Sequence, residues 1–360
     1  MSRSNVYYWK CDRPAAFHGT QHRGEPDAAL EAQLLRALEH RFQSAVQLTP
    51  AHGQGNHLTW KAQVGGQKLF IRVENGPERD NHLQMESRVM ALVKKAGLPL
   101  PEVVATDATH SSVAFAWQAL EYIPWPDLNC FYKAGTLHLP KIALEIGASV
   151  AQWQDIQPLG FGPFDARTSQ KEQPLCGFHA LYENYFLLRL EEHLGFLVRR
   201  GFLSAPQSDR IHRSLLEHRS LLALGTGCLV HKDLALWNIL GTETAVKAFI
   251  DFDDAISGDP LDDLSLLACF HDASFLDKAL EGYQSVRPLP SEHRRRFWMH
   301  LLRNMIVKAV IRVGAGYFER DSGFFLIGGG ASGATLKEFT ETRLFRALDG
   351  LQSDADISLL

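Results

Sequence analysis

Cysteine is scarce in this chain, and its spacing does not suit metal binding. The 360 residues include five cysteines, an odd number, and no two of them form a C-x-x-C pair. Scattered cysteines of this kind indicate free, mostly buried thiols in a reducing compartment, so a fold held by disulfides is not expected. The five positions are Cys11, Cys130, Cys176, Cys228 and Cys269.

Long apolar runs and broad basic stretches are also missing. Residues 1–10 lack the apolar core of a signal peptide, and the most apolar later stretch, 305–314, is interrupted by Lys308 and Arg312. The formal net charge is −4, and the short basic cluster 294–296 is typical of a solvated helix face. We therefore expect a cytoplasmic protein with no membrane segment and no nucleic-acid partner. The sequence leaves the oligomeric state open.

Length and composition indicate two lobes. A chain of 360 residues exceeds what a single hydrophobic core normally supports, and 45% apolar residues suffice to fill two. The pattern changes near residue 124. Strand-like runs with two helical stretches, 28–42 and 80–96, come before it, and mostly helical spacing of apolar residues comes after it. The expected strands are 45–48, 58–64, 68–73, one near Val103, and 113–122, and the expected later helices cover 142–153, 178–198 and 297–311.

The expected fold class is therefore α+β, with a small antiparallel sheet lobe and a larger, mainly helical lobe. We expect an N-terminal extension with one helix over residues 1–43 and a nucleotide-binding lobe over 44–123. The helical lobe, over 124–360, should contain the catalytic loop and the acceptor-binding region.

Three polar residues between positions 233 and 251 point to a chemistry. Asp233 is followed by Asn238 and then by Asp251, and each stands at the edge of a short apolar run. The runs 228–230, 239–240 and 246–250 have the length and composition of buried strands. The three polar side chains should therefore meet on one rim, although any one of them alone would be typical of a turn or a helix cap.

Phosphoryl transfer requires groups of this kind. Its transition state is loose, so catalysis consists mostly of positioning and of neutralising charge with a metal ion. Mg²⁺ prefers oxygen ligands, which Asn238 and Asp251 can supply. Asp233 can orient a substrate hydroxyl and accept its proton, a contribution of roughly 10² to 10⁴ in rate.

The segment from His231 to Ser265 resembles the catalytic core of the aminoglycoside phosphotransferase and choline kinase-like group, the small-molecule relatives of protein kinases. The matching motifs are H-x-D-L-x-x-x-N-I-L, I-D-F-D-D-A and G-D-P-L-D-D-L-S. The resemblance covers nearly the whole chain from about residue 44. It implies a bilobal protein kinase-like fold with the nucleotide bound between the lobes.

The same resemblance implies roles for single residues. Asp233 would be the catalytic base, Asn238 and Asp251 would bind Mg²⁺, and Asp263 would brace the catalytic loop. Lys232 stands where a glycine is more usual in this group. The sequence leaves open whether its ammonium group meets the γ-phosphate or solvent.

The small lobe should supply the rest of the nucleotide site. Gly53, Gly55 and Asn56 lie between two strand-like runs, where glycines let backbone N–H groups approach phosphate oxygens. A plain hairpin turn explains the two glycines equally well. Arg72 occupies the strand position at which the resembling family carries a basic residue for the α- and β-phosphates, where most kinases use lysine.

Glu86 gives a check that does not depend on the resemblance. A 3.6-residue period places it on the apolar arc of its helix, with Leu83, Val89, Met90 and Val93. A buried carboxylate needs a cationic partner, and Arg72 is the nearest candidate. The other reading is that Glu86 lies at the edge of the arc and reaches water.

The segment 120–123 is then expected to be the hinge between the lobes. Its backbone, through the Glu121 carbonyl and the Ile123 N–H, would pair with adenine. The expected cofactors are thus Mg²⁺ and ATP or GTP as co-substrate.

The phosphate acceptor should lie near Asp233, against the helical lobe. Acidic and aromatic residues there would suit an aminoglycoside, a sugar or amino sugar, or a choline-like amine, but they fit ordinary helix surface and core better. The candidates are Asp127, Glu183, Asp253, Tyr182, Tyr185 and Phe186.

Two other classes of function remain as alternatives. A metal-dependent phosphohydrolase could use His231, Asp233 and the pair His271 and Asp272, but it would leave the spacing of Asn238 unexplained. A catalytically weak or inactive nucleotide-binding module would keep the fold without the chemistry. The leading hypothesis is a Mg²⁺-dependent kinase that acts on a hydroxyl of a small molecule.

Overall fold

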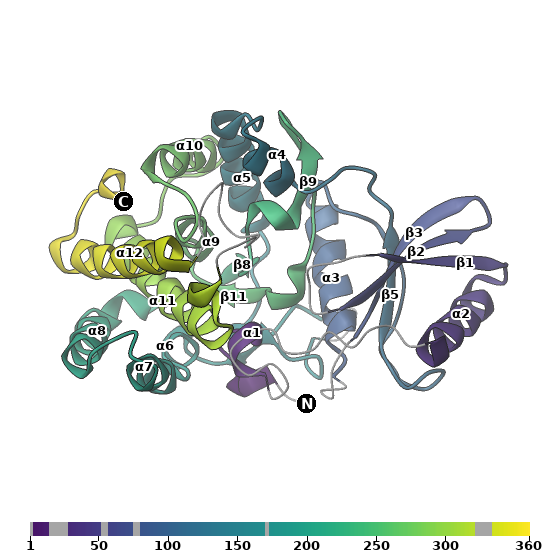
Figure 1. The fold of residues 1–360 in the computed structure, drawn as a ribbon, viewed down its shortest axis with the longest axis horizontal. Coiled ribbons are helices and arrows are strands. Elements are labelled where there is room, and N and C mark those ends of the chain that lie inside the picture. Colours follow the sequence, from purple (N-terminus) through teal and green to yellow (C-terminus); the bar gives the residue numbers. More distant parts are fainter. Residues whose placement is uncertain (1–2, 14–27, 52–56, 75–79, 170–172, 321–332) are drawn as a thin grey trace.

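The structure is a computed structural model that describes residues 3–13, 28–51, 57–74, 80–169, 173–320 and 333–360. It has two lobes, a small one built on a sheet and a larger helical one (Figure 1). The expected α+β, bilobal fold is confirmed. None of the described helices is both long and apolar enough to span a lipid bilayer.

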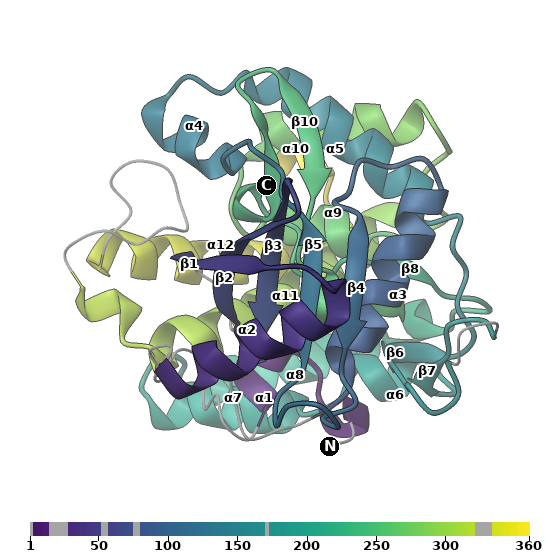
Figure 2. The same cartoon turned by 90° about the vertical axis from the view of Figure 1, so that its right-hand side faces the viewer.

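The small lobe is a five-stranded antiparallel sheet with the strand order β1-β2-β3-β5-β4. Gly65 and Gly66, both at positive φ, form the two-residue turn between β2 and β3, which only glycine, Asn or Asp adopts easily. Helix α2 lies across the sheet and α3 runs beside β4 (Figure 2). The elements are α2 (Ala28–Phe42), β1 (Val46–Ala51), β2 (Leu58–Val64), β3 (Gln67–Val73), α3 (His82–Lys95), β4 (Val103–Asp107) and β5 (Trp117–Glu121).

Apolar alternation explains how α2 covers the sheet. Leu34 and Leu38 of α2 are fully buried and share a core cluster with Trp60, Leu69 and Ile71 of the central strands. Side chains on alternate positions of a strand point to the same face, so β2 and β3 present these residues to one helix. The other face is left for α3, which carries Glu86 toward the cleft.

The helical lobe is organised around α11, in which every side chain from Arg296 to Arg312 is buried. A helix buried on all sides is typical of the centre of a large domain. The helices are α4 (Leu128–Ala134), α5 (Leu139–Trp153), α6 (Tyr182–Phe186), α7 (Leu190–Arg199), α8 (Ala205–Glu217), α9 (Asp262–Leu267), α10 (Ala273–Gln284), α11 (His293–Gly314) and α12 (Gly333–Ser353).

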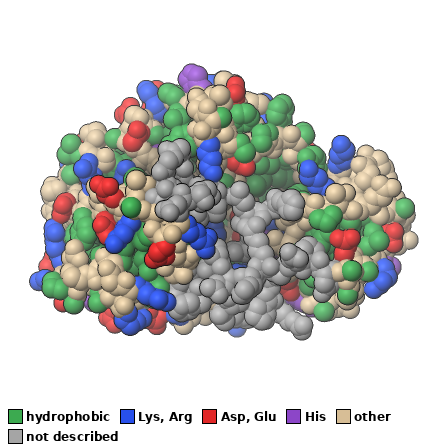
Figure 3. All heavy atoms as spheres, viewed as in Figure 1, with side chains coloured by type: hydrophobic (Ala, Val, Ile, Leu, Met, Phe, Trp, Pro, Cys, Tyr) green, Lys and Arg blue, Asp and Glu red, His purple; other side chains and the backbone are tan. Residues whose placement is uncertain are grey.

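Short strands in the helical lobe carry the loops that face the small lobe. One sheet has the order β7-β6-β11-β8, and β9 pairs with β10 in a hairpin. The strands are β6 (Phe161–Phe164), β7 (Gly177–His179), β8 (Cys228–Val230), β9 (Ile239–Thr242), β10 (Ala245–Phe249) and β11 (Ile256–Gly258). On the face seen in Figure 3, basic and acidic side chains are interspersed over both lobes.

The structure corrects two expected elements. Residues 178–198 do not form one helical stretch, because β7 pairs with β6 and the left-handed backbone at Arg189 (φ 57°) separates α6 from α7. The strand expected over 113–122 begins only at Trp117. In both places the apolar residues are buried, but apolar content alone does not separate a short strand from a short helix.

The described residues at the N-terminus do not extend away from the molecule. A short 3-10 helix, η1 (Arg3–Asn5), leads into α1 (Trp9–Asp12), and α1 packs against α11 of the helical lobe. The side chains of Val6, Tyr7, Tyr8 and Trp9 are buried. Residues 3–12, which we call the N-terminal segment, are therefore part of the helical lobe's core.

Candidate active site

The loop after β8 and the loop after β10 bring the three predicted residues together. Asn238 ends the 3-10 helix η3 (Leu236–Asn238), and its Nδ2 donates to the Asp233 carbonyl at 2.8 Å and to Asp233 Oδ2 at 3.1 Å. The Ile250 N–H donates to the Asn238 carbonyl at 3.0 Å, which places Asp251 next to Asn238. The expected common rim exists because two short buried strands end at it.

Asp251 is held in an unusual backbone conformation. Its φ of 66° and ψ of 55° lie in the left-handed region, which is costly for residues other than glycine and is often found at functional sites. Its Oδ1 accepts from Arg72 Nη2 at 2.7 Å, and its side chain is 27% exposed toward the cleft. A carboxylate oxygen thus faces the space between the lobes.

The oxygens of this rim fit a magnesium ion. Asn238 donates through its side-chain Nδ2, so its side-chain oxygen Oδ1 is left to bind a metal ion. Within the described part of the chain, Asp251 uses only Oδ1 in hydrogen bonds. An amide oxygen and a carboxylate oxygen are hard ligands of the kind that Mg²⁺ takes alongside phosphate oxygens and water. Asn238 and Asp251 would hold such an ion.

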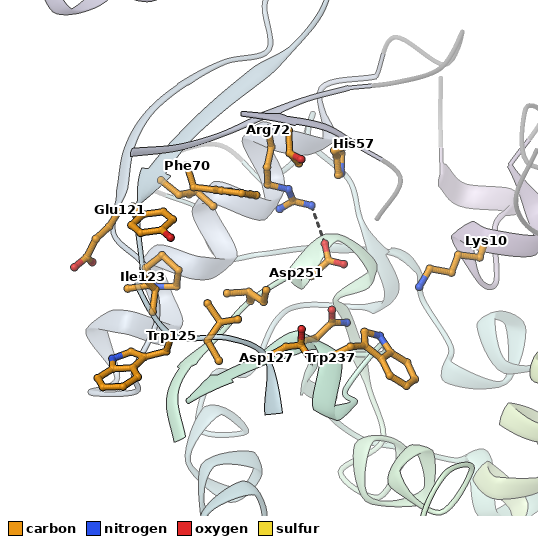
Figure 4. A pocket seen from close by; sticks show the side chains of 17 residues that line it. Lys10, His57, Phe70, Arg72, Glu121, Ile123, Trp125, Asp127, Trp237 and Asp251 are labelled. Atoms are coloured by element: carbon orange, nitrogen blue, oxygen red, sulfur yellow. Dashed lines mark hydrogen bonds and ion pairs between the residues drawn. The ribbon is translucent and has the colours of Figure 1, made fainter. Parts of the chain in front are cut away.

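Arg72 and Glu86 form the pair that the sequence predicted. Arg72 Nη1 donates to Glu86 Oε1 at 2.5 Å, and the Glu86 side chain is fully buried. Burial raises the pKa of Glu86, against the opposing effect of Arg72. Since Arg72 also pairs with Asp251, one guanidinium group joins the sheet, helix α3 and the helical lobe (Figure 4). It places positive charge at the mouth of the site.

A cavity of about 370 Å³ lies between the lobes, above Asn238 and Asp251. Phe70 and Leu120 line it from the small lobe, and Leu240 and Ile250 line it from the helical lobe (Figure 4). Apolar walls with a few polar groups at one end are typical of a nucleotide pocket. The predicted hinge residues Glu121 and Ile123 also line the cavity, together with Tyr122, Trp125 and Asp127.

Lys232 contacts neither solvent nor the cleft. Its side chain is 1% exposed, and Nζ donates to Asp262 Oδ2 at 2.7 Å, to Asn304 Oδ1 at 3.2 Å and to Tyr7 Oη at 3.3 Å. Its φ of 69° explains why glycine would suit this position. Both environments that the sequence left open for this lysine are therefore wrong.

Asp263 holds the backbone of the catalytic loop. It accepts from the His231 N–H at 2.8 Å and from the Lys232 N–H at 3.0 Å, and it is fully buried. Burial raises the pKa of Asp263 to about 6, despite the opposing effect of His231 and of these two hydrogen bonds. Asp263 thus holds the backbone of the loop that presents Asp233.

Asp233 itself is covered by residues that the sequence did not indicate. Its Oδ1 accepts from Tyr8 Oη at 2.6 Å, and its Oδ2 accepts from Lys10 Nζ at 2.8 Å. Lys308 of α11 reaches Oδ1 at 3.4 Å. Burial alone would raise the pKa of Asp233, but the ammonium groups of Lys10 and Lys308 hold it well below its usual value. Asp233 is therefore an ionised carboxylate with cations on both sides.

The acceptor residues proposed from the sequence do not form an acidic, aromatic pocket at Asp233. Asp127 caps α4 by accepting from the Cys130 N–H, and Asp253 pairs with Arg3 at 3.6 Å. Glu183 is half-buried on α6, and the aromatic candidates Tyr182, Tyr185 and Phe186 belong to the core. Glu183 and the three aromatic residues therefore fit the reading as surface and core, whereas Asp127 also lines the cavity between the lobes.

The ligand set imagined for a phosphohydrolase is not assembled either. Within the described residues, the one group of three or more His, Cys, Asp or Glu side chains with their ligand atoms close together is Cys11, Asp12 and His193. His193 Nε2 pairs with Asp12 at 2.8 Å while Nδ1 faces Arg303 at 3.1 Å. An arginine facing the ring disfavours a cation, so these groups form a hydrogen-bonded cluster.

Two other groups complete the account of the predicted site. The structure brings together Asp233, Asn238, Asp251, Arg72 and Glu86. The turn residues Gly53, Gly55 and Asn56 lie outside the described residues. The catalytic and binding roles of all these residues stay predictions.

Comparison with known proteins agrees with this geometry. The profile of a family described as the phosphotransferase enzyme family, APH, matches residues 46–298, more than two thirds of the chain. No curated protein matches the sequence.

Solved structures share the fold at low sequence identity. A protein assigned as a fructosamine-3-kinase from Thermobifida fusca has a TM-score of 0.60 and 18% identity, over 87% of this chain and 98% of that one. Aminoglycoside phosphotransferase APH(4)-Ia has a TM-score of 0.59 and 16% identity, over 91% of this chain and 100% of that one. A thermostable mutant of APH(4)-Ia in complex with ADP and hygromycin B has a TM-score of 0.59 and 16% identity, over 88% of this chain and 98% of that one.

Proposed function

The chain belongs to the APH phosphotransferase enzyme family, and we propose that it transfers the γ-phosphoryl group of ATP or GTP to a hydroxyl of a small molecule in the presence of Mg²⁺. The observation that carries this proposal is the meeting of Asp233 with Asn238 and Asp251, the last two of which line the cavity between the lobes. Nucleotide complexes of the structurally similar APH(4)-Ia support the choice of co-substrate.

Each residue of the site has a task in this reaction. The apolar walls at Phe70 and Ile250 would hold the nucleobase of the nucleotide, and Arg72 would bind its phosphate oxygens. Mg²⁺ held by Asn238 and Asp251 would neutralise phosphate charge. Asp233, ionised at neutral pH, would orient the acceptor hydroxyl and take its proton. Because phosphoryl transfer passes through a loose transition state, positioning and charge carry most of the catalysis.

The acceptor is the part of the proposal that the N-terminal segment affects most. Tyr8 Oη occupies the place beside Asp233 Oδ1 that an acceptor hydroxyl would take. A small molecule therefore reaches Asp233 only after the Tyr8 side chain has left. The same contact supports a second candidate, a nucleotide-binding module with little turnover. A cytoplasmic location, expected from the free cysteines, stays a prediction.

A binding and turnover experiment tests the proposal and separates the candidates. Thermal melting with Mg·ATP and Mg·GTP measures nucleotide binding. ADP or GDP release is then followed with aminoglycosides, monosaccharides, amino sugars, choline-like amines and hydroxy amino acids. Acceptor-dependent release supports the kinase, and stabilisation without release from any acceptor supports the binding module. If Mg-nucleotide neither stabilises the protein nor is consumed, both candidates are wrong.

A further inference from the structure

The N-terminal segment is built into the helical lobe. Tyr7, Tyr8, Trp9 and Cys11 are each no more than 5% exposed. Tyr185 Oη donates to the Tyr7 carbonyl at 2.9 Å, and the ring of Tyr7 stacks on that of Tyr185. These contacts hold the segment along its length rather than at one point.

Ion pairs fix both ends of the segment. Arg3 pairs with Asp80, just before helix α3, at 3.0 Å, and Asp12 pairs with Arg189 at 3.3 Å and accepts a hydrogen bond from His193 of α7 at 2.8 Å. The side chains of Arg3, Asp80, Asp12 and His193 are between 1% and 12% exposed. Undocking is costly because Arg3, Asp80 and Asp12 would each lose the partner that compensates its charge.

The segment delivers a hydroxyl to the proposed catalytic base. Tyr8 Oη donates to Asp233 Oδ1 at 2.6 Å, a short hydrogen bond to a charged acceptor. Lys308 Nζ donates to the same Tyr8 oxygen at 3.2 Å. A general base must lie within hydrogen-bond reach of the proton that it removes, and Tyr8 meets that condition in the structure.

The segment also places a cation between the base and the nucleotide cavity. Lys10 Nζ donates to Asp233 Oδ2, and the 30% exposed side chain lines the cavity together with Asn238 and Asp251 (Figure 4). An ammonium group in that place faces the region where the end of a triphosphate would lie beside Asn238 and Asp251. Asp233 thus contacts a hydroxyl, from Tyr8, through one oxygen and a cavity-lining cation, Lys10, through the other.

Two outcomes are open to a hydroxyl so placed. The segment could leave the site to admit another acceptor, or Tyr8 could accept the phosphoryl group itself. Leaving would expose the side chains of Tyr7, Tyr8 and Trp9 to water, which is unfavourable because all three are buried. It would also break the ion pairs of Arg3 and Asp12. Transfer to Tyr8 requires neither change.

We propose that Tyr8 is a phosphoryl acceptor, so that the site modifies its own N-terminal segment within one chain. The inference rests on the proposed phosphotransferase function. In the reaction, a bond forms between Tyr8 Oη and the γ-phosphorus of ATP, and the bond from that phosphorus to the β-γ bridging oxygen breaks. Its electron pair leaves with ADP, and the phenolic proton passes to Asp233.

The charges around Tyr8 suit this product. A phosphotyrosine carries about −1.5 to −2 charges at neutral pH and forms strong hydrogen bonds to cations. Lys10 and Lys308 both contact Asp233, and from there their ammonium groups can donate to a phosphate on Tyr8. Burial raises the pKa of Tyr8, with Asp233 acting in the same direction, so the phenol keeps its proton until transfer.

Mass spectrometry of the purified full chain with Mg·ATP tests the proposal. We expect up to one phosphate per chain, located on Tyr8 rather than Tyr7 by fragmentation, at a rate independent of protein concentration. Tyr8→Phe should take up none, and Asp233→Asn should slow uptake by about 100-fold or more. Tyr132→Phe is the matched control, since its half-buried ring on α4 packs edge-on against His271, and it should behave as the wild type.

A measurement without nucleotide checks the docking on which the proposal depends. Cys11 belongs to the segment and is buried, whereas Cys130 is exposed. Pulsed alkylation followed by peptide mass spectrometry should therefore label Cys130 quickly and Cys11 at least tenfold more slowly. Equal rates would mean that the segment is not docked, and the proposal would be overturned.

The variant Tyr8→Ala separates failure of this inference from failure of the proposed function. If wild type or Tyr8→Ala consumes ATP with added acceptors while Tyr8 of the wild type stays unmodified, the inference is wrong and the phosphotransferase stands. If neither protein binds or consumes Mg·ATP, the proposed function is wrong and the inference with it. A phosphate on Tyr8 that Asp233→Asn fails to acquire supports both.

Discussion

At the scale of single residues, the site depends on a few groups that each satisfy two partners. Asn238 donates to Asp233 and keeps an oxygen for a metal ion, and Arg72 pairs with Glu86 and Asp251 at once. Shared partners of this kind make the effects of substitutions non-additive. The effect of replacing one residue should therefore be measured on both nucleotide binding and turnover.

Asp251→Ala should weaken binding of Mg·ATP as well as turnover. The change removes a proposed metal ligand and one of the two carboxylates that Arg72 meets. Isothermal titration with ATP, in the presence and absence of Mg²⁺, measures the effect. We expect the gain in affinity that Mg²⁺ gives the wild type to fall at least tenfold in the variant. An unchanged dependence on Mg²⁺ would contradict the assignment of Asp251.

Lys232→Met should destabilise the fold because it leaves Asp262 buried without its cation. Breaking a buried pair by removing one partner typically costs about 3–5 kcal/mol, although part of that is regained here if the second charge is also removed. We expect Lys232→Met combined with Asp262→Asn to be more stable than Lys232→Met alone. Urea denaturation of the two single variants and the double variant measures this coupling. Strict additivity would show that the contact between Lys232 and Asp262 contributes nothing.

At the scale of elements, helices α5 and α10 approach one another through glycine. A side chain at Gly147 would overlap the carbonyl oxygen of Ala279, and one at Gly282 would overlap the carbonyl oxygen of Leu144. Such close backbone contact sets the distance between the two helices and leaves no room for a methyl group. Helix α5 in turn packs against β8 and β10, the strands that precede the two catalytic loops.

Gly147→Ala should therefore destabilise the helical lobe, although alanine is the better helix former by about 1 kcal/mol. We expect a loss of roughly 1–3 kcal/mol or more in the free energy of unfolding, because overpacking must move a helix. Gly225→Ala is the matched control. A Cβ at Gly225 has no atom within 4 Å, so its effect should stay within about 0.5 kcal/mol. Equal stability of both variants would show that α5 and α10 are not in contact at these glycines.

The elements also show what the sequence can and cannot predict. The strands β8 and β10 were predicted because a short apolar run ends at a polar residue in each, and Arg72 was paired with Glu86 because helical periodicity turned Glu86 inward. These signals are local. Tyr8 and Lys10 reach a residue more than 220 positions away, and nothing in the periodicity of a short N-terminal segment indicates a partner at that distance.

Lys232 is a different kind of miss. Its departure from glycine was visible in the sequence, but a charged residue normally indicates exposure. The buried partners that reverse this, Asp262 and Asn304, belong to α9 and α11, which are distant in the chain. The short strand β7 was missed because a segment of three residues is too short for its apolar pattern to distinguish a strand from a helix.

At the scale of the whole molecule, buried charges join the two lobes and tie the helical lobe together. Arg72 of the small lobe pairs with Asp251 of the helical lobe, and Arg3 of the N-terminal segment pairs with Asp80 of the small lobe. Asp259 connects β11 to α11, where it accepts from Arg296 Nε at 2.9 Å and Nη2 at 2.8 Å and lies 3.2 Å from His300. Stability should therefore depend on the protonation of buried carboxylates.

Asp259 should contribute stability that is lost in acid. Burial raises the pKa of Asp259, but His300 and Arg296 outweigh it and lower the pKa to about 2. Because the pKa in the folded state lies below the unfolded value of about 3.9, the contribution is present above about pH 4 and falls as the pH approaches 2. Its size is on the order of 2–3 kcal/mol. Urea denaturation between pH 7 and pH 2.5 should show wild type and Asp259→Asn converging in acid, and a constant difference would contradict the assignment.

The most direct test of the central claim is transfer of label from γ-labelled ATP, measured for the wild type and for Asp233→Asn with and without Mg²⁺. The label is followed into the chain itself and into the panel of small hydroxyl acceptors. We expect transfer by the wild type that requires Mg²⁺, and a loss of at least 100-fold in Asp233→Asn, which should still fold and bind nucleotide. Equal transfer by the two proteins, or no binding of Mg·ATP by either, would contradict the account.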